Sequence, residues 1–149
     1  MSFSYKNQTL HAESVAITDL MATYGSPLYV YSQTDIENNW REFNQAFGNH
    51  PHLVCYAVKA NSNLAVLNTL AKIGAGFDIV SEGELERVLA AGGQANLCVF
   101  SGVAKTVHEI ERALEVGVRC FNVESASELD RIESVAQSLN TQAPISIRV

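Results

Sequence analysis

Short apolar runs recur along the chain and predict five β-strands. Each run is rich in β-branched and aromatic residues, and successive runs begin some twenty residues or more apart. The runs are Leu53–Val58, Phe77–Val80, Leu97–Ser101, Arg119–Val123 and Ile145–Val149. The stretches between them leave room for one helix each, which is the rhythm of repeated βα units.

The segments between these runs carry the start and stop signals of helices. The Ser/Thr-x-x-Glu pattern of the capping box marks expected helix starts. It occurs at Thr34…Glu37, Ser81…Glu84, Thr106…Glu109 and Ser125…Glu128. Residues suited to the left-handed conformation follow the expected helices. These are Gly48, Gly74, Gly92, Gly117 and Asn140. Strands, caps and spacing together predict an α/β fold with a parallel sheet.

The two ends of the chain differ from this repeat. Leu28–Tyr31 predicts a strand that need not belong to the same sheet, and a helix is expected from about Gln33 to Phe47. We therefore separate an N-terminal segment, 1–32, from residues 33–149. The last run, Pro144–Val149, is typical of a buried strand, yet nothing follows it. A parallel sheet is normally covered on its faces and edges, so we expect the chain to be a fragment.

Polar residues alternate with apolar ones along the expected strands. Because side chains alternate across a strand, Asp78, Asn122 and Arg148 lie opposite the bulky apolar face, and Lys59 shares the small-residue face of the first run. Only the third run fits poorly, since Ser101 shares a face with apolar neighbours. If the sheet curls into a (β/α)8 barrel, Lys59 and Arg148 lie at the carboxyl-terminal mouth, where such barrels hold their sites.

Lys59 has two interpretations. A lysine at a strand end usually reaches solvent. A lysine enclosed by apolar strands instead loses hydration of its ammonium form, which favours the free amine that forms Schiff bases. Asp78 and Arg148 likewise either contact a ligand or form a charge pair that compensates one another.

Composition narrows the class of partner. The net charge of −6 and the absence of a basic block argue against nucleic acid or an anionic membrane, which leaves a small molecule. No leader or spanning segment stands out, so a cytoplasmic protein is expected. Cys55, Cys98 and Cys120 are odd in number and lie among apolar residues, as buried reduced thiols do. The four histidines form no ligand pattern with them, so no metal site is expected.

Two motifs carry a specific resemblance. The run 56–63, YAVKANSN, followed by 76–85, GFDIVSEGEL, resembles the group IV decarboxylases with an alanine-racemase-like barrel. The segment 100–106, then 117–124 and the terminal 147–149, continues in that family's order. Within the group, the chain is most similar to the diaminopimelate decarboxylase family. The similarity runs from about Gly25 to the end and implies the first part of a pyridoxal-phosphate-binding barrel, with residues 1–32 contributing to a β-domain.

The resemblance also implies roles for individual residues. Lys59 would form the Schiff base with pyridoxal 5'-phosphate, Asp78 would lie near the cofactor, and Arg148 would line the same pocket; Ser101 is a weaker candidate. The implied reaction converts meso-2,6-diaminopimelate to L-lysine and CO2, in a homodimer of the full-length protein. Because the family's phosphate loop and substrate-site motifs are missing from these residues, the fragment should be inactive.

Three alternatives stay open. The substrate could be another basic amino acid, namely ornithine, arginine or carboxynorspermidine, since Lys59 and Asp78 would look similar in all of these enzymes. Alanine racemase fits the 81–85 and 147–149 segments less well. A non-enzymatic protein that carries pyridoxal phosphate, or an inactive relative that binds partners, is the alternative from a different class.

Overall fold

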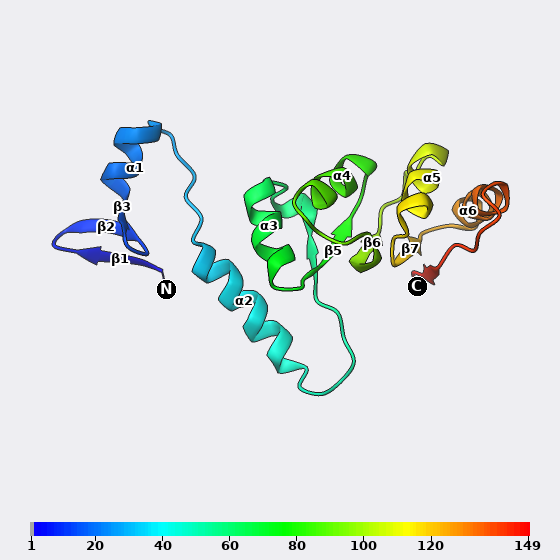
Figure 1. Cartoon of the computed structure of the whole chain (residues 1–149), viewed down its shortest axis with the longest axis horizontal. Coiled ribbons are helices and arrows are strands. Elements are labelled where there is room, and N and C mark those ends of the chain that lie inside the picture. The colour runs from blue at the N-terminus through cyan, green and yellow to red at the C-terminus, as the bar shows by residue number, and fades with distance from the viewer. Residues whose placement is uncertain (1) are drawn as a thin grey trace. The chain divides into compact units, whose positions relative to one another are not determined.

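The structure, a computed structural model, describes residues 2–149 and divides into two compact units, 1–49 and 50–149 (Figure 1). Each unit has its own sheet. Among residues 2–149, no helix has the length and apolar character needed to cross a bilayer.

The first unit combines a small antiparallel sheet with two helices. Its elements are β1 (Phe3–Lys6), β2 (Thr9–Ala12), β3 (Val15–Ala16), α1 (Ile17–Tyr24) and α2 (Gln33–Ala46). The strands pair in the order β1-β2-β3. Asn7 and Gln8 connect β1 to β2 with φ of 50° and 66°, as a two-residue hairpin turn requires.

Two expectations for this unit were wrong. Leu28–Tyr31 is not part of a strand, because it pairs with none of residues 2–149; the strands of the unit lie instead within 3–16. Helix α2 begins at Gln33 as expected, but its cap is Ser32, two residues before the expected Thr34, since the Ser32 hydroxyl accepts the backbone N–H of Asp35 at 3.0 Å. Glu37 does not close a capping box there and instead pairs with Arg41 one turn later.

The second unit is a run of βα repeats around one parallel sheet. Its elements are β4 (Cys55–Ala57), the 3-10 turn η1 (Val58–Ala60), α3 (Leu64–Lys72), β5 (Gly76–Ile79), α4 (Glu82–Ala90), η2 (Ala95–Leu97), β6 (Cys98–Phe100), α5 (Val107–Val116), β7 (Cys120–Val123), α6 (Ala126–Ser138) and β8 (Ile145–Ile147). The strand order β4-β5-β6-β7-β8 follows the chain, and every pairing is parallel. A helix joins each strand to its neighbour, so the predicted α/β fold class is confirmed.

The expected caps of this unit are also confirmed. Ser81, Thr106 and Ser125 each accept the backbone N–H of the glutamate three residues later. At Thr106 both halves of the capping box form. Gly117 ends α5 in the left-handed region with φ of 76°, which glycine adopts without the steric cost of a Cβ.

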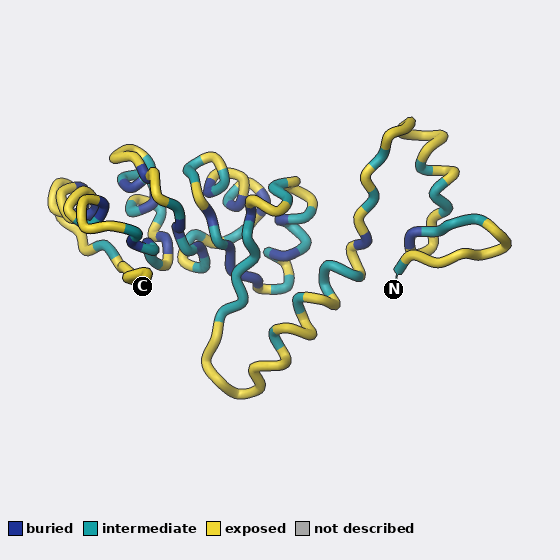
Figure 2. Tube along the Cα trace, turned by 180° about the vertical axis from the view of Figure 1, so that it is seen from behind, coloured by how far each residue is buried: buried dark blue, intermediate teal, exposed yellow. Residues whose placement is uncertain are grey.

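The sheet has one covered face and one open face. Phe77, Ile79, Phe100 and Phe121 are completely buried on the covered face, where the rings of Phe100 and Phe121 stack 5.9 Å apart. Helices α4, α5 and α6 each contribute buried apolar residues to this core. Figure 2 draws the buried positions along the chain in dark blue. The opposite face carries smaller and polar residues of intermediate exposure, among them Asp78 and Asn122. Polar groups therefore gather on one side of the sheet, as the alternation predicted.

Candidate functional site

Lys59 lies at the carboxyl end of β4, at the edge strand of the sheet. The strand ends at Ala57, and Lys59 is the middle residue of η1, so the strand alternation used to place it does not extend that far. Lys59 is exposed, and burial among apolar strands is therefore not found. Its ammonium group makes no hydrogen bond or ion pair with any of residues 2–149. The Lys59 amine is thus free to engage a ligand.

Asp78 lies on β5, next to β4, and its carboxylate is hydrogen-bonded from the side of β6 and β7. Its cross-strand partners are Ala57 on β4 and Val99 on β6. The Ser101 hydroxyl donates to Asp78 Oδ1 at 2.5 Å, and Asn122 Nδ2 donates to Ser101 Oγ at 2.9 Å. Ser101, which fitted the strand pattern poorly, therefore belongs with the polar groups of the open face.

Arg148 follows β8 and does not pair with Asp78. Arg148 Nη1 lies 3.0 Å from Glu124 Oε1, and both residues line a hollow of about 220 Å³ beyond β7 and β8. Asp78 is three strands away, which is roughly 14 Å along a sheet. The interpretation of Asp78 and Arg148 as a mutual charge pair was therefore wrong, because each carries out its interactions with another residue.

A buried ion pair that the sequence did not predict lies near the carboxyl ends of β6 and β7. Lys105 Nζ donates to Glu128 Oε1 at 2.6 Å, to Gly102 O at 2.7 Å and to Asn122 O at 2.9 Å. The side chains of Lys105 and Glu128 are 1% and 3% exposed. In sequence, a lysine in a polar loop and a glutamate in the first turn of a helix are typical surface residues. The fold brings these two together in the interior.

The environment of the three cysteines disfavours their thiolate forms. Burial raises the pKa of the Cys98 thiol to about 12 and also raises the pKa values of Cys55 and Cys120. A thiol nucleophile needs a depressed pKa. All three thiols are free; Cys98 is buried as expected, whereas Cys55 and Cys120 are only half-buried.

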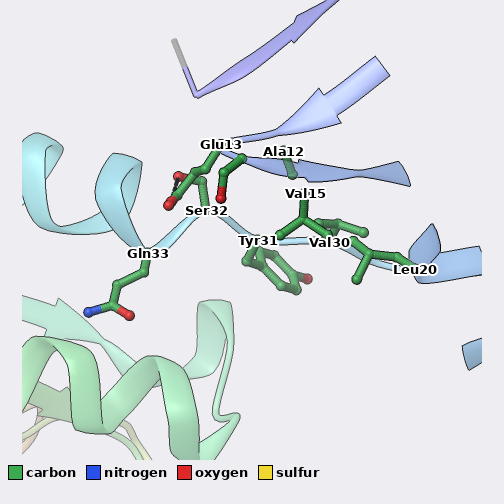
Figure 3. A pocket seen from close by; sticks show the side chains of 9 residues that line it. Ala12, Glu13, Val15, Leu20, Val30, Tyr31, Ser32 and Gln33 are labelled. Atoms are coloured by element: carbon green, nitrogen blue, oxygen red, sulfur yellow. Dashed lines mark hydrogen bonds between the residues drawn. The ribbon is translucent and has the colours of Figure 1, made fainter. Parts of the chain in front are cut away.

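A second pocket lies within the first unit (Figure 3). It encloses about 230 Å³ and is lined by Ala12, Glu13, Ser14, Val15, Leu20, Val30, Tyr31, Ser32 and Gln33. Its carboxylate is already engaged, since Glu13 Oε1 accepts Ser32 Oγ at 2.7 Å and the Thr34 backbone N–H at 3.0 Å. These hydrogen bonds lower the pKa of Glu13, and they tie the turn after β2 to the start of α2. The groups of this pocket thus serve the local fold.

The carboxyl ends of β4 to β8 remain the strongest candidate site. Lys59 and Arg148 follow β4 and β8, and Asp78 lies near the end of β5, so an amine, a guanidinium and a carboxylate come from strands that point the same way. An amine that is free of partners can bond covalently to a carbonyl, and a cation can bind an anionic group. This donor set fits pyridoxal phosphate, which carries an aldehyde and a phosphate.

Comparison with known proteins agrees with this chemistry. Residues 33–149 match the family described as "Pyridoxal-dependent decarboxylase, pyridoxal binding domain". Over 147 residues the chain is 58% identical to a diaminopimelate decarboxylase of Haemophilus influenzae, covering 99% of this chain and 35% of that protein.

Solved structures give the same result. A diaminopimelate decarboxylase from M. jannaschii matches with a TM-score of 0.95 and 34% identity, over 99% of this chain and 36% of that one. The enzyme from Helicobacter pylori, solved in complex with L-lysine, matches with a TM-score of 0.87 and 44% identity, over 89% of this chain and 34% of that one. The chain spans about a third of the length of these relatives. The expected family and its cofactor are confirmed: the chain belongs to the pyridoxal-dependent decarboxylases, and residues 33–149 correspond to their pyridoxal-binding domain.

Proposed function

We propose that the full-length protein containing this chain removes CO2 from meso-2,6-diaminopimelate to give L-lysine, with pyridoxal phosphate held on Lys59. The observation that carries the proposal is the free Lys59 amine at the carboxyl end of β4, one strand from the Asp78 carboxylate. The proposed substrate rests on the similarity to relatives that are diaminopimelate decarboxylases.

The roles of the residues follow from their chemistry. Lys59 Nζ would hold the cofactor through a covalent link to its aldehyde. The Asp78 carboxylate would accept a hydrogen bond from the bound cofactor or from the Lys59 amine. Arg148 would offer its exposed guanidinium to an anionic group while one of its nitrogens stays paired with Glu124. When bound, pyridoxal phosphate supplies an electron sink for the pair left by the departing carboxylate.

Covalent trapping tests the role of Lys59. The full-length protein is expected to become yellow with pyridoxal phosphate and, after borohydride reduction, to yield a labelled peptide that contains Lys59. Lys59→Ala should abolish this label. Lys72→Ala, which removes another exposed lysine at the end of α3, is the matched control and should leave the label intact. An undiminished adduct in Lys59→Ala would disprove the assignment.

The substrate is tested by CO2 release from meso-diaminopimelate, ornithine and arginine with the same full-length protein. We expect release from meso-diaminopimelate alone, and none from residues 1–149 by themselves. Preference for ornithine or arginine would replace the proposed substrate. A yellow protein that releases CO2 from none of them would be a non-enzymatic carrier.

We further propose that residues 1–32 belong to a β-domain and that the full-length protein is a cytoplasmic homodimer. The antiparallel pairing of β1 to β3, in contrast to the parallel second sheet, supports the first statement. The homodimer rests on the family resemblance. Light scattering of the full-length protein would test it, and a monomer mass would reject it.

A further inference from the structure

Three polar side chains form a directed hydrogen-bond chain across the open face of the sheet. Asn122 on β7 donates through Nδ2 to Ser101 Oγ, which in turn donates to Asp78 Oδ1 on β5. A serine hydroxyl has a single proton. Because the Asn122 amide already donates to the Ser101 oxygen, that proton is directed at the carboxylate. The chain thus fixes one Asp78 oxygen and leaves Asp78 Oδ2 available to a ligand.

The far end of this chain is anchored in the protein interior. Lys105 Nζ binds the carbonyl oxygens of Gly102 and Asn122, so one ammonium group holds the residue after Ser101 and the backbone of Asn122. The buried carboxylate of Glu128 neutralises that ammonium. Ser101 is itself only 8% exposed. The donors to Asp78 are therefore fixed before any ligand binds, which is the requirement for a preorganised site.

We propose that Ser101 and Asn122 are positioning residues that orient Asp78 for the pyridoxal phosphate site. The inference rests on the proposed function, since Asp78 is taken to face the cofactor. Neither residue needs to touch the cofactor, because both act through the Asp78 carboxylate. The proposal also explains why a serine follows β6 at a position whose neighbours on the strand are apolar.

A double-mutant cycle on cofactor affinity tests the proposal. The apo form of the full-length protein is titrated with pyridoxal phosphate, and the visible absorbance gives the dissociation constant. Ser101→Ala is expected to raise this constant roughly tenfold, as the loss of a hydrogen bond to a charged group implies. In an Asp78→Ala background the same change should have an effect of less than about twofold, because no carboxylate remains to be oriented. Equal effects in the two backgrounds would overturn the proposal.

Ser101→Thr separates positioning from packing. Threonine keeps the hydroxyl and should restore affinity to within about threefold of wild type, whereas a role of Ser101 as a mere space filler predicts no better binding than in Ser101→Ala. Ser134→Ala removes a serine hydroxyl from α6, where it donates to Asp130 O, and is the matched control with unchanged affinity. Failure of the wild-type protein to bind pyridoxal phosphate would refute the proposed function itself, and is thus distinct from wild-type binding that Ser101→Ala leaves unaltered.

Asn122→Asp tests the direction of the chain with almost no change of shape. An aspartate at this position accepts a hydrogen bond where the asparagine amide donated one. The Ser101 hydroxyl would then turn from Asp78 toward residue 122. We expect a loss of affinity at least as large as that of Ser101→Ala, and wild-type affinity in Asn122→Asp would contradict the directed chain.

Discussion

Lys105 and Glu128 form an ion pair of 2.6 Å in the interior of the second unit, between the loop after β6 and the start of α6. Every polar atom of the pair is used. The three N–H groups of Lys105 meet Glu128, Gly102 and Asn122, and the second carboxylate oxygen of Glu128 accepts the backbone N–H of Glu124 at 2.8 Å. Such saturation offsets the desolvation of two buried charges, so the pair joins the ends of β6 and β7 on the side where the candidate site lies.

Breaking this pair should destabilise the protein strongly. Lys105→Met leaves the Glu128 carboxylate buried without a counter-charge, and we expect the free energy of unfolding to fall by about 3–5 kcal/mol. Urea unfolding followed by circular dichroism measures this change. The double variant Lys105→Met/Glu128→Leu should recover much of the loss, because no isolated charge remains.

An exposed pair provides the control. Arg112 on α5 lies 2.7 Å from Glu86 on α4, but both side chains are well exposed to water. Arg112→Met should therefore leave the urea midpoint nearly unchanged. If Arg112→Met and Lys105→Met had equal effects, burial would not be the cause.

The capping box of α5 gives a smaller and more local effect. Thr106 Oγ1 accepts the Glu109 backbone N–H, and the Glu109 carboxylate accepts the Thr106 backbone N–H at 2.9 Å. Thr106→Ala removes the hydroxyl half of this exchange and should lower the free energy of unfolding by about 1 kcal/mol. Thr106→Ser keeps the hydroxyl, and its free energy of unfolding, measured by urea unfolding, should remain within a few tenths of a kcal/mol of wild type. A loss in the serine variant equal to that in the alanine variant would contradict the cap as the cause.

Two glycines should respond in opposite ways to alanine. A Cβ on Gly76 would lie 2.8 Å from Cys55 Sγ and 2.9 Å from Leu97 O, so Gly76→Ala forces neighbouring groups apart and should cost about 1–3 kcal/mol. At Gly83, in the first turn of α4, the nearest atom to a Cβ would be Ser81 Oγ at 3.9 Å. Gly83→Ala should therefore stabilise the helix by up to about 1 kcal/mol. Melting temperatures of the two variants, compared with wild type, test both signs.

The sequence predicted those features that depend on neighbouring residues. The start of α5 at Thr106 and its end at Gly117 each depend on a few consecutive residues, and both were found where expected. Strand alternation likewise placed Asp78 on the open face. It failed at Lys59 because the chain turns into a 3-10 helix after Ala57, and an alternation of period two no longer applies beyond that point.

Contacts between distant segments could not be predicted in the same way. The sequence pattern gave no reason for a serine at position 101, among apolar strand residues. The reason is its hydrogen bonds to Asp78 and Asn122, each more than twenty residues away in the sequence. Lys105 and Glu128 are separated by a helix and a strand, and no local pattern indicates that they meet. Such pairs depend on strand register, which the sequence of one chain leaves open.

The buried thiol of Cys98 should make the stability of the protein depend on alkaline pH. Burial raises its pKa from 9.0 to about 12 in the folded state, where Cys98 Sγ also donates to Gln94 O at 3.4 Å. Between these two values the unfolded chain releases the thiol proton while the folded chain retains it, so the unfolded state binds fewer protons. The free energy of unfolding should then fall by up to about 1.4 kcal/mol per pH unit above pH 9. Below pH 9 the thiol is protonated in both states, so this group makes the stability neither rise nor fall with pH. Cys98→Ala removes the titrating group, so urea unfolding across this range should show a smaller decline than in wild type even though the alanine variant is less stable at neutral pH. Parallel pH curves for the two proteins would show that Cys98 does not contribute to the alkaline decline.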